Sequence, residues 1–324
     1  MKNNWTNGIM SVIVGDALGN PVQFMSRDKV MQRGLVTGME AGGVFHMPAG
    51  CWTDDGSMTL ATLDSILQTG KIDPDDIMKK FIEWDRDGKY TPTGKAYDQG
   101  ITCTEALYSY RKGKKWDRCG KTGENANGNG ALMRIMPVCL FAAYQQFTDG
   151  LSDFKAVMMA QHVTLMTHNH LRACTASGLY YFMCRELLRD NDGGSFREIL
   201  QKGLDAGIRF YQEHDLDDEM GHFARIRDLE ALAQIPSEQV RSSGYVIHTI
   251  EAALWSLVTE ESLPDSLLKA VNLGDDADTV GAVAGGLAGL YYGYEAVPED
   301  WKRALKKRES LEEFCLEADR TFPM

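Results

Sequence analysis

The chain has 324 residues, of which 44% are hydrophobic and 25% are charged. A chain of this length and composition can bury a sizeable core without disulfides or structural metals. Its 46 acidic residues outnumber the 34 basic ones and give a formal net charge of -12. This charge repels a nucleic-acid backbone unless basic side chains gather on one face. We find no such cluster in the sequence and expect no nucleic-acid partner.

The sequence also argues against secretion and membrane insertion. Residues 1–10 lack the apolar core of a signal peptide. The least charged stretch, 279–294, is rich in Gly and Ala and falls short of the ~18 apolar residues that indicate a membrane span. Seven cysteines without a CxxC pair indicate reduced thiols rather than a disulfide framework. We therefore expect a cytoplasmic protein with no membrane partner. We also expect a monomer.

Helical spacing of apolar residues recurs along the chain, whereas strand-like alternation is scarce. The clearest helix begins at Asp73-Pro74, where a cap and a proline precede early acids and helically spaced apolar residues. No linker, repeat or low-complexity tract divides the chain. We predict an all-α fold with residues 1–324 in a single multi-helix domain. The other expected helices, in chain order, are 4–18, 58–68, 101–111, 154–166, 171–188, 196–214, 244–259, 264–272 and 280–292.

A first acidic cluster stands directly before a predicted helix, in the segment WTDDGS at residues 52–57. One interpretation is structural, because a capping residue followed by acids in the first turn complements the helix dipole. The other interpretation is a site for a hard cation, formed by the carboxylates of Asp54 and Asp55 with nearby hydroxyl groups.

A second acidic cluster, GDDADT at residues 274–279, also opens a predicted helix. That helix carries Gly281, Gly285 and Gly289 at four-residue spacing, a small-residue face that lets another backbone approach closely. If the two clusters converge, they offer only carboxylate and hydroxyl oxygens, the ligands that Mg²⁺, Mn²⁺ or Ca²⁺ prefer over zinc. A cation would also relieve the repulsion among the acids. The number of acids favours two metals over one.

A glycine-rich segment, NGNGALMR at residues 127–134, runs into an apolar helix. Backbone amides at such a helix start can bind phosphate, although a glycine-rich turn is also common as a purely structural element. The segment lacks the Lys-Ser/Thr ending of a P-loop. Acids beside an anion-binding loop are compatible with a metal-dependent nucleotide phosphohydrolase as well as with a glycosidic-bond hydrolase.

Several of these segments together resemble the ADP-ribosylglycohydrolase family, the group that includes the dinitrogenase-reductase-activating glycohydrolase. The resemblance covers nearly the whole chain. Its five segments occur in the family's order: GDALG at 15–19, WTDD at 52–55, GNGA at 128–131 followed by Met133-Arg134, Thr167-His168, and GDDADT at 274–279.

The resemblance implies an all-α enzyme that hydrolyses the glycosidic bond between ADP-ribose and a protein side chain or small acceptor, with two Mg²⁺ or Mn²⁺ ions as cofactors. Its partner would be an ADP-ribosylated protein or another ADP-ribose conjugate. The implied metal ligands are Thr53, Asp54, Asp55, Asp276, Asp278 and Thr279. The implied catalytic residues are Asp54, Asp55 and Asp98. The implied substrate-binding residues are Gln23, Gly128, Asn129, Gly130, His168 and Tyr245.

Two positions depart from the family pattern. Gln23 stands where many relatives have a Glu, so a carboxylate near the metals is missing, and Asp275 stands where relatives often have a Gly. The change at position 23 keeps open a non-catalytic ADP-ribose-binding protein on the same scaffold, beside the hydrolase and the phosphohydrolase. Free ADP-ribose as the product, phosphate or AMP as the product, and binding without turnover would distinguish the three.

Overall fold

The computed structural model describes residues 3–189 and 193–324. Within these residues the chain folds into fifteen α-helices joined by loops and short 3-10 turns, and the all-α prediction is confirmed. The α-helices are α1 (Asn4–Gly19), α2 (Arg27–Arg33), α3 (Asp54–Thr69), α4 (Pro74–Asp87), α5 (Ile101–Arg111), α6 (Met136–Asp149), α7 (Asp153–Leu165), α8 (Leu171–Leu188), α9 (Phe196–Glu213), α10 (Leu229–Ala233), α11 (Val246–Val258), α12 (Leu263–Val271), α13 (Ala277–Tyr292), α14 (Glu299–Ala304) and α15 (Arg308–Thr321).

Short 3-10 turns mark several of the loops. They are η1 (Asn20–Val22), η2 (Trp116–Arg118), η3 (Glu124–Ala126), η4 (Leu132–Arg134), η5 (Met220–Ile226), η6 (Ser237–Gln239) and η7 (Tyr294–Ala296).

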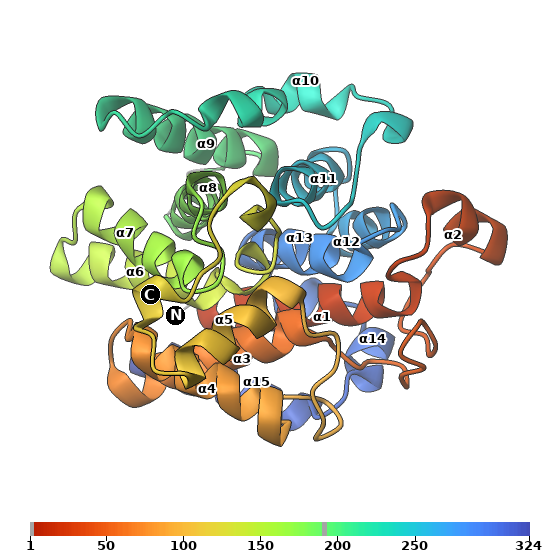
Figure 1. Ribbon diagram of the computed structural model, residues 1–324. Helices are drawn as coiled ribbons and strands as arrows, with labels where there is room; N and C mark the ends of the chain where they lie inside the picture. Colours follow the sequence, from red (N-terminus) through yellow and green to blue (C-terminus); the bar gives the residue numbers. More distant parts are fainter. Residues whose placement is uncertain (1–2, 190–192) are drawn as a thin grey trace.

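Helices α1 and α13 pack backbone against backbone in the middle of the molecule (Figure 1). Glycines on both helices make this approach possible. A Cβ atom on Gly281 would lie 2.4 Å from the carbonyl oxygen of Gly15, and one on Gly285 would lie 2.2 Å from that of Ser11. Both distances are far below van der Waals contact. The small-residue face predicted on the second acidic helix therefore serves to bring α1 alongside it.

The remaining helices surround this pair. In Figure 1, α9 and α10 lie above it and α4 and α15 lie below it. The two ends of the chain meet, since the Thr6 hydroxyl donates to Asp319 at 2.6 Å and the indole N–H of Trp5 donates to the Phe322 carbonyl. One continuous cluster of buried hydrophobic side chains extends from Trp5 to Phe322.

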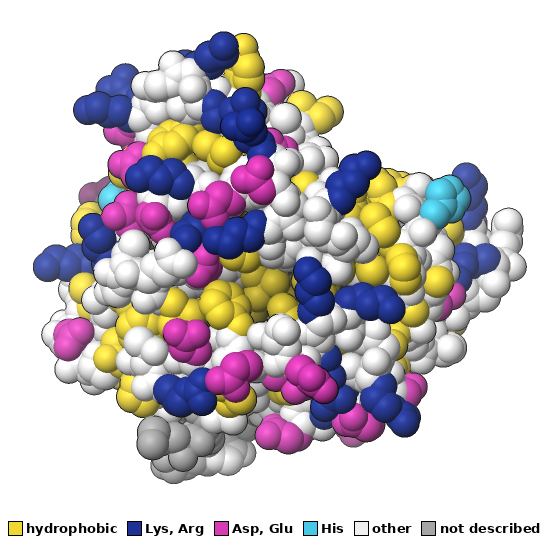
Figure 2. All heavy atoms as spheres, turned by 90° about the horizontal axis from the view of Figure 1, so that it is seen from below, with side chains coloured by type: hydrophobic (Ala, Val, Ile, Leu, Met, Phe, Trp, Pro, Cys, Tyr) yellow, Lys and Arg dark blue, Asp and Glu magenta, His cyan; other side chains and the backbone are white. Residues whose placement is uncertain are grey.

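Each predicted helix exists, with boundaries that differ by a few residues. The helix expected at 58–68 begins earlier, at Asp54, and the one expected at 280–292 begins at Ala277. Asp54, Asp55 and Asp278 therefore lie in the first turn of a helix rather than in front of it, while Asp276 stands at an N-cap position. None of the described helices is long and apolar enough to cross a membrane. On the face shown in Figure 2, basic and acidic side chains are interspersed among hydrophobic ones.

Candidate active site

The two acidic clusters meet at the amino-terminal ends of α3 and α13. Asp54 and Asp55 lie in the first turn of α3, while Asp276 stands at the N-cap position of α13 without a capping hydrogen bond from its side chain, and Asp278 follows in the first turn. All four are buried or nearly so, and Asp278 has no exposed surface. The electrostatic field of Asp55 and Asp276 reaches Asp278 and, after burial, raises its pKa further. Acids of the two clusters thus lie close enough in the folded chain to influence one another electrostatically.

A further carboxylate, that of Asp16 on α1, holds the start of α3. Its oxygens accept hydrogen bonds from the backbone N–H groups of Thr53, at 2.9 Å, and Gly56, at 2.8 Å. Thr53 itself makes no side-chain cap, and its hydroxyl donates instead to Asp55 at 3.1 Å. Asp16 therefore supplies the capping that the first helical turn requires. No role was predicted for Asp16, although it stands within the GDALG segment.

Burial raises the pKa values of all these acids. It is the largest cause for Asp16, whose pKa rises to about 7, and for Asp98, whose pKa rises to about 6. Burial and then neighbouring carboxylates raise the pKa values of Asp54 and Asp55 well above the usual range. A group of acids placed in this way cannot all be ionised at neutral pH without compensating positive charge.

Several oxygens of the cluster are available to a cation. In the described part of the chain no N–H or O–H group donates to Oδ1 of Asp55 or to either carboxylate oxygen of Asp278. Buried polar atoms of this kind normally have a partner. The donor set, made only of carboxylate and hydroxyl oxygens, suits Mg²⁺ or Mn²⁺. No three acidic, His or Cys side chains among residues 3–189 and 193–324 are arranged so that together they could hold a metal ion.

Gln23 lies in the same cluster, at the point where the chain leaves η1. Its amide Nε2 donates to Oδ2 of Asp98 at 2.6 Å, and the side chain is only 3% exposed. Backbone pairing of the next residues with the acidic loop fixes this position, because Phe24 N–H donates to the Asp275 carbonyl and Asp275 N–H donates to the Met25 carbonyl. The residue that departs from the family pattern is thus part of the acidic centre.

A cavity of about 220 Å³ opens above the acids. It is lined by polar residues of the cluster and by the glycine-rich loop, while the exposed side chains of Phe24 and Ile101 stand at its edge. Of the predicted site residues, the following line it: Gln23, Asp54, Asp98, Gly128, Asn129, Gly130, His168, Asp276 and Thr279.

The glycine-rich loop is fixed by hydrogen bonds to other parts of the protein. Asn129 donates from its amide to Asp276 at 2.6 Å and to Thr249 at 2.9 Å, and its backbone N–H donates to the Gly244 carbonyl. The amide of Asn129 therefore orients an acid of the cluster. Gly128 pairs with Tyr245 in an isolated antiparallel bridge, so the loop is tied to the start of α11.

His168 and Arg134 pack against the glycine-rich loop. The ring of His168 lies against Gly128 and Gly130, where added Cβ atoms would come within 3.3 Å and 3.1 Å of it. Burial lowers the pKa of His168 to about 3, so the ring is neutral at pH 7. Arg134 is fully buried, donates to the carbonyl of Gly130 at 3.1 Å and to the Thr167 hydroxyl at 2.8 Å, and was missed as a site residue.

Tyr245 does not line the cavity. Its hydroxyl accepts a hydrogen bond from Arg172 at 2.9 Å, and the same guanidinium donates to Glu124 and Glu219. Arg172 thereby joins the segment before the glycine-rich loop to the start of α11. No sequence pattern pointed to it, because its partners come from three distant segments.

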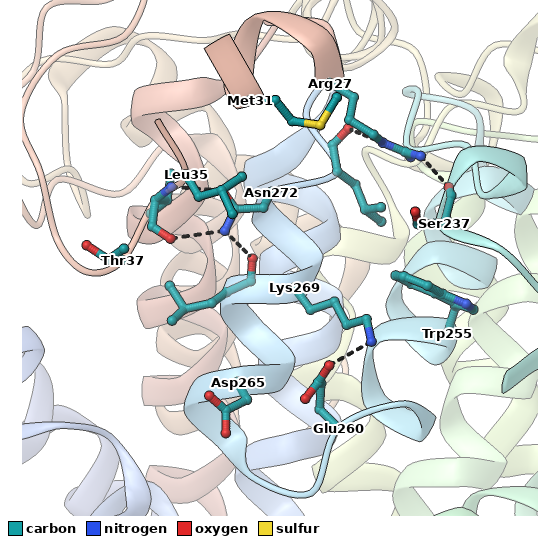
Figure 3. Close-up of a pocket in the computed structure, with 13 residues that line it drawn as sticks. Arg27, Met31, Leu35, Thr37, Ser237, Trp255, Glu260, Asp265, Lys269 and Asn272 are labelled. Atoms are coloured by element: carbon teal, nitrogen blue, oxygen red, sulfur yellow. Dashed lines mark hydrogen bonds and ion pairs between the residues drawn. The ribbon is translucent and has the colours of Figure 1, made fainter. Parts of the chain in front are cut away.

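A larger hollow of about 480 Å³ lies between α2 and α12, away from the acids (Figure 3). None of the predicted site residues in the described chain lines it. Arg27 lines it and donates to the carbonyls of Leu273, Val240 and Ser237. Leu273 directly precedes the acidic loop, so Arg27 holds that loop at its base.

Comparison with known proteins identifies the class of protein to which this fold and site belong. The chain belongs to the ADP-ribosylglycohydrolase family, whose model matches residues 3–323. The family and its named members are ADP-ribosyl glycohydrolase enzymes, as the sequence resemblance predicted.

Individual relatives match along most of their length. The ADP-ribosylarginine hydrolase Tri1 of Serratia proteamaculans is 31% identical over 94% of this chain and 75% of its own. The ADP-ribosyl-[dinitrogen reductase] glycohydrolase of Rhodospirillum rubrum is 28% identical over 94% of this chain and 90% of its own. A solved ADP-ribosylglycohydrolase-related protein complex contains a chain that is 32% identical, with a TM-score of 0.78 over 98% of this chain and 97% of that one.

Proposed function

We propose that this chain hydrolyses the bond between C1 of the ribose of ADP-ribose and a protein arginine, releasing ADP-ribose. The observation that carries the proposal is the cavity whose floor is a cluster of buried carboxylates and whose wall is the glycine-rich loop. The arginine acceptor is supported by two relatives that are named ADP-ribosylarginine hydrolases and are 31% and 30% identical to this chain.

We further propose that two Mg²⁺ or Mn²⁺ ions occupy the acidic centre, at the cavity floor that Asp54 and Asp276 line and among the acids beside it. Their ligands would come from Thr53, Asp54, Asp55, Asp276, Asp278 and Thr279. When bound, such ions hold hydroxyl groups and water in fixed positions and lower the pKa of that water. The unpaired oxygens of Asp55 and Asp278 and the raised pKa values of the acids support this assignment.

The chain's own residues would perform three tasks in the reaction. Asp54 or Asp55 accepts the proton of the attacking water, a role that suits a buried carboxylate with a raised pKa. The carboxylates of the floor stabilise the positive charge that develops on the ribose as the glycosidic bond breaks. Neutral His168 and the backbone of the glycine-rich loop hold the substrate without adding charge beside the cations.

Product analysis tests the proposed function directly. Purified protein with MgCl₂ or MnCl₂ is incubated with ADP-ribosyl-arginine, ADP-ribosyl-serine and O-acetyl-ADP-ribose, and the products are separated by chromatography. We expect free ADP-ribose, formed fastest from the arginine conjugate. AMP or phosphate would indicate the nucleotide phosphohydrolase instead. Tight binding of ADP-ribose without turnover of any conjugate would indicate the binding protein.

Cation binding should depend on pH in a defined direction. The pKa values of Asp16 and Asp98 in the folded protein, about 7 and about 6, lie above the value of about 4 for an exposed Asp. The stability that these groups contribute is therefore present at low pH and is lost as pH rises from about 4 to about 7. We expect the cation-free protein to melt at a lower temperature at pH 8 than at pH 5.

Added cation should reverse this loss, because it favours the ionised acids. Thermal unfolding with and without 5 mM MgCl₂ should show a much larger rise in Tm at pH 8 than at pH 5, since a ligand present at about 100 times its Kd stabilises by roughly 2.7 kcal/mol. Asp278→Asn should shrink the rise at pH 8. An equal rise at both pH values would contradict a cation site built from these acids.

Gln23 provides a second test of the same centre. Its amide donates to Asp98, whereas a Glu would add one more carboxylate to the cluster and remove the donor. We expect Gln23→Glu to lower the Tm of the cation-free protein at pH 8 and to enlarge the rise that Mg²⁺ produces. Gln23→Leu, which removes the donor without adding charge, serves as the control and should show no such enlargement. A Gln23→Glu variant that responds to Mg²⁺ like the wild type would separate position 23 from the cation site.

A further inference from the structure

Six basic residues lie within a stretch of eleven, from 111 to 121, next to α5 and η2. We call them the basic strip: Arg111, Lys112, Lys114, Lys115, Arg118 and Lys121. All six are exposed. The expectation that basic residues do not cluster is wrong for this segment. Its six basic residues are accompanied by one acid, Asp117, although the whole chain has a net charge of -12. The short loop between α5 and η2 brings its residues to one place.

Helix capping explains only some of the basic strip. Arg111 ends α5 and Lys112 is its C-cap, where positive charge complements the helix dipole. The dipole's effect falls off within the last turn, so it gives no reason for the cations that follow. Among the described residues only Lys121 of the strip forms an ion pair, with Glu105 at 2.8 Å. The other five cations therefore remain available to a negatively charged partner.

The backbone that carries the basic strip is well fixed. The N–H of Lys114 donates to the Ser109 carbonyl at 3.2 Å, and the thiol of Cys119 donates to the Lys115 carbonyl at 3.1 Å. The ring of Trp116 packs on His162 with centroids 5.5 Å apart. Cations on a fixed backbone can bind a partner with a smaller loss of entropy than cations on a flexible tail.

The basic strip borders the candidate active site on both sides in the sequence. Helix α5 begins at Ile101, which lines the cavity, and ends at the strip. At the other end, Lys121 N–H donates to the Thr167 carbonyl and Lys121 forms a bridge with His168, another lining residue. A molecule bound in the cavity and extending over α5 would therefore meet the strip.

We propose that the basic strip docks an acidic segment of the protein whose arginine carries ADP-ribose. The proposal rests on the proposed function, since the cavity has to hold the ADP-ribose of that same protein. Complementary charge raises the rate of encounter more than it adds affinity. A protein segment fits better than a nucleic acid, because a long phosphate backbone would also meet the excess negative charge of the rest of the chain.

Two synthetic peptides test the proposal. Each carries one ADP-ribosyl-arginine, flanked by four Glu in one peptide and by four Ser in the other. For the wild type at low salt, kcat/KM should be roughly 10-fold higher for the Glu peptide, which is the lower range of electrostatic steering. The difference should disappear in about 0.5 M NaCl, where charges are screened beyond a few ångströms.

Charge reversal locates the effect. The triple variant Lys112→Glu, Lys114→Glu and Lys115→Glu should lose the preference for the Glu peptide while hydrolysing the Ser peptide at the wild-type rate. A control triple variant, Lys29→Glu, Lys155→Glu and Lys306→Glu, makes the same change of net charge at exposed positions elsewhere and should keep most of the preference. Equal loss in both variants would overturn the proposal, because net charge and not the strip would then be responsible.

The remaining outcomes separate this proposal from the proposed function. If the wild type hydrolyses both peptides equally well, the docking proposal fails and the hydrolase stands. If it hydrolyses neither, the proposed function fails. Fluorescence anisotropy with the labelled Glu peptide then tests whether the basic strip binds an acidic segment. Binding by the wild type but not by the strip variant would support the docking proposal. Tighter binding of a 20-base-pair DNA duplex than of the Glu peptide, lost in the strip variant, would overturn an acidic protein segment as the partner.

Discussion

Replacing Asp55 by Asn should lower kcat by roughly 10²- to 10⁴-fold, the range typical of a lost general base. Asp55 is 1% exposed, one of its oxygens has no donor in the described chain, and the other accepts the Thr53 hydroxyl. An Asn of the same shape can keep the contact with Thr53 but cannot accept a proton from water. It also removes one negative charge from the proposed cation site, so the loss should persist at saturating Mg²⁺.

Asp64 provides the control for Asp55, because it is another buried Asp on the same helix and does not line the cavity. Its carboxylate pairs with Lys80 at 2.9 Å and accepts the Tyr90 hydroxyl at 2.5 Å, away from the cavity. Asp64→Asn should therefore lower Tm while leaving kcat within about 2-fold of the wild type, since its partners are structural. Steady-state rates with ADP-ribosyl-arginine measure both variants. Comparable kcat values for Asp55→Asn and wild type would remove Asp55 from the mechanism.

The acidic centre could be predicted in outline because each cluster opens a helix. Carboxylates in a first helical turn are recognisable in sequence from the cap and the apolar spacing that follows. Their convergence depends on how α3 and α13 are placed, and the sequence indicated only that α13 would approach some other backbone. That the partner is α1, and that Asp16 on α1 caps α3, follows from tertiary packing between segments far apart in the chain.

Other site features were missed because their partners are distant in sequence. In the sequence, Arg134 is not distinguished from the apolar residues around it at the start of a helix. In the structure it is buried beside the glycine-rich loop, and its Cζ atom lies 4.5 Å from the centroid of the Phe81 ring. Arg172 donates hydrogen bonds to Glu124 of η3 and to Glu219, the residue before η5. The basic strip was overlooked for a different reason. Its charges are numerous enough to notice, but whether they form ion pairs is decided only in the folded chain.

The approach of α1 to α13 connects the fold to the site, so a single methyl group there should have a large effect. We expect Gly281→Ala to destabilise the protein by about 3 kcal/mol or more, the upper range for overpacking a close contact. The added Cβ would stand 2.4 Å from the Gly15 carbonyl oxygen, which is backbone and cannot rotate away. Because Asp16 follows Gly15 and Asp278 precedes Gly281, separating the helices would also move these two acids of the centre away from each other.

Gly8→Ala gives a closely matched comparison, because it makes the same substitution at another buried glycine, on the partner helix α1. A Cβ there would meet the ends of two flexible side chains, Leu290 and Met136, both at 3.2 Å. Ala is favoured over Gly in a helix interior by about 1 kcal/mol. The stability of Gly8→Ala should therefore remain within about 1 kcal/mol of the wild type. Gly281→Ala has the same gain in helix propensity and should still lose stability. Urea unfolding measures both, and Mg²⁺ should raise the Tm of Gly8→Ala but scarcely that of Gly281→Ala. If the two variants unfold at the same urea concentration, the contact between the two backbones does not hold the acidic centre together.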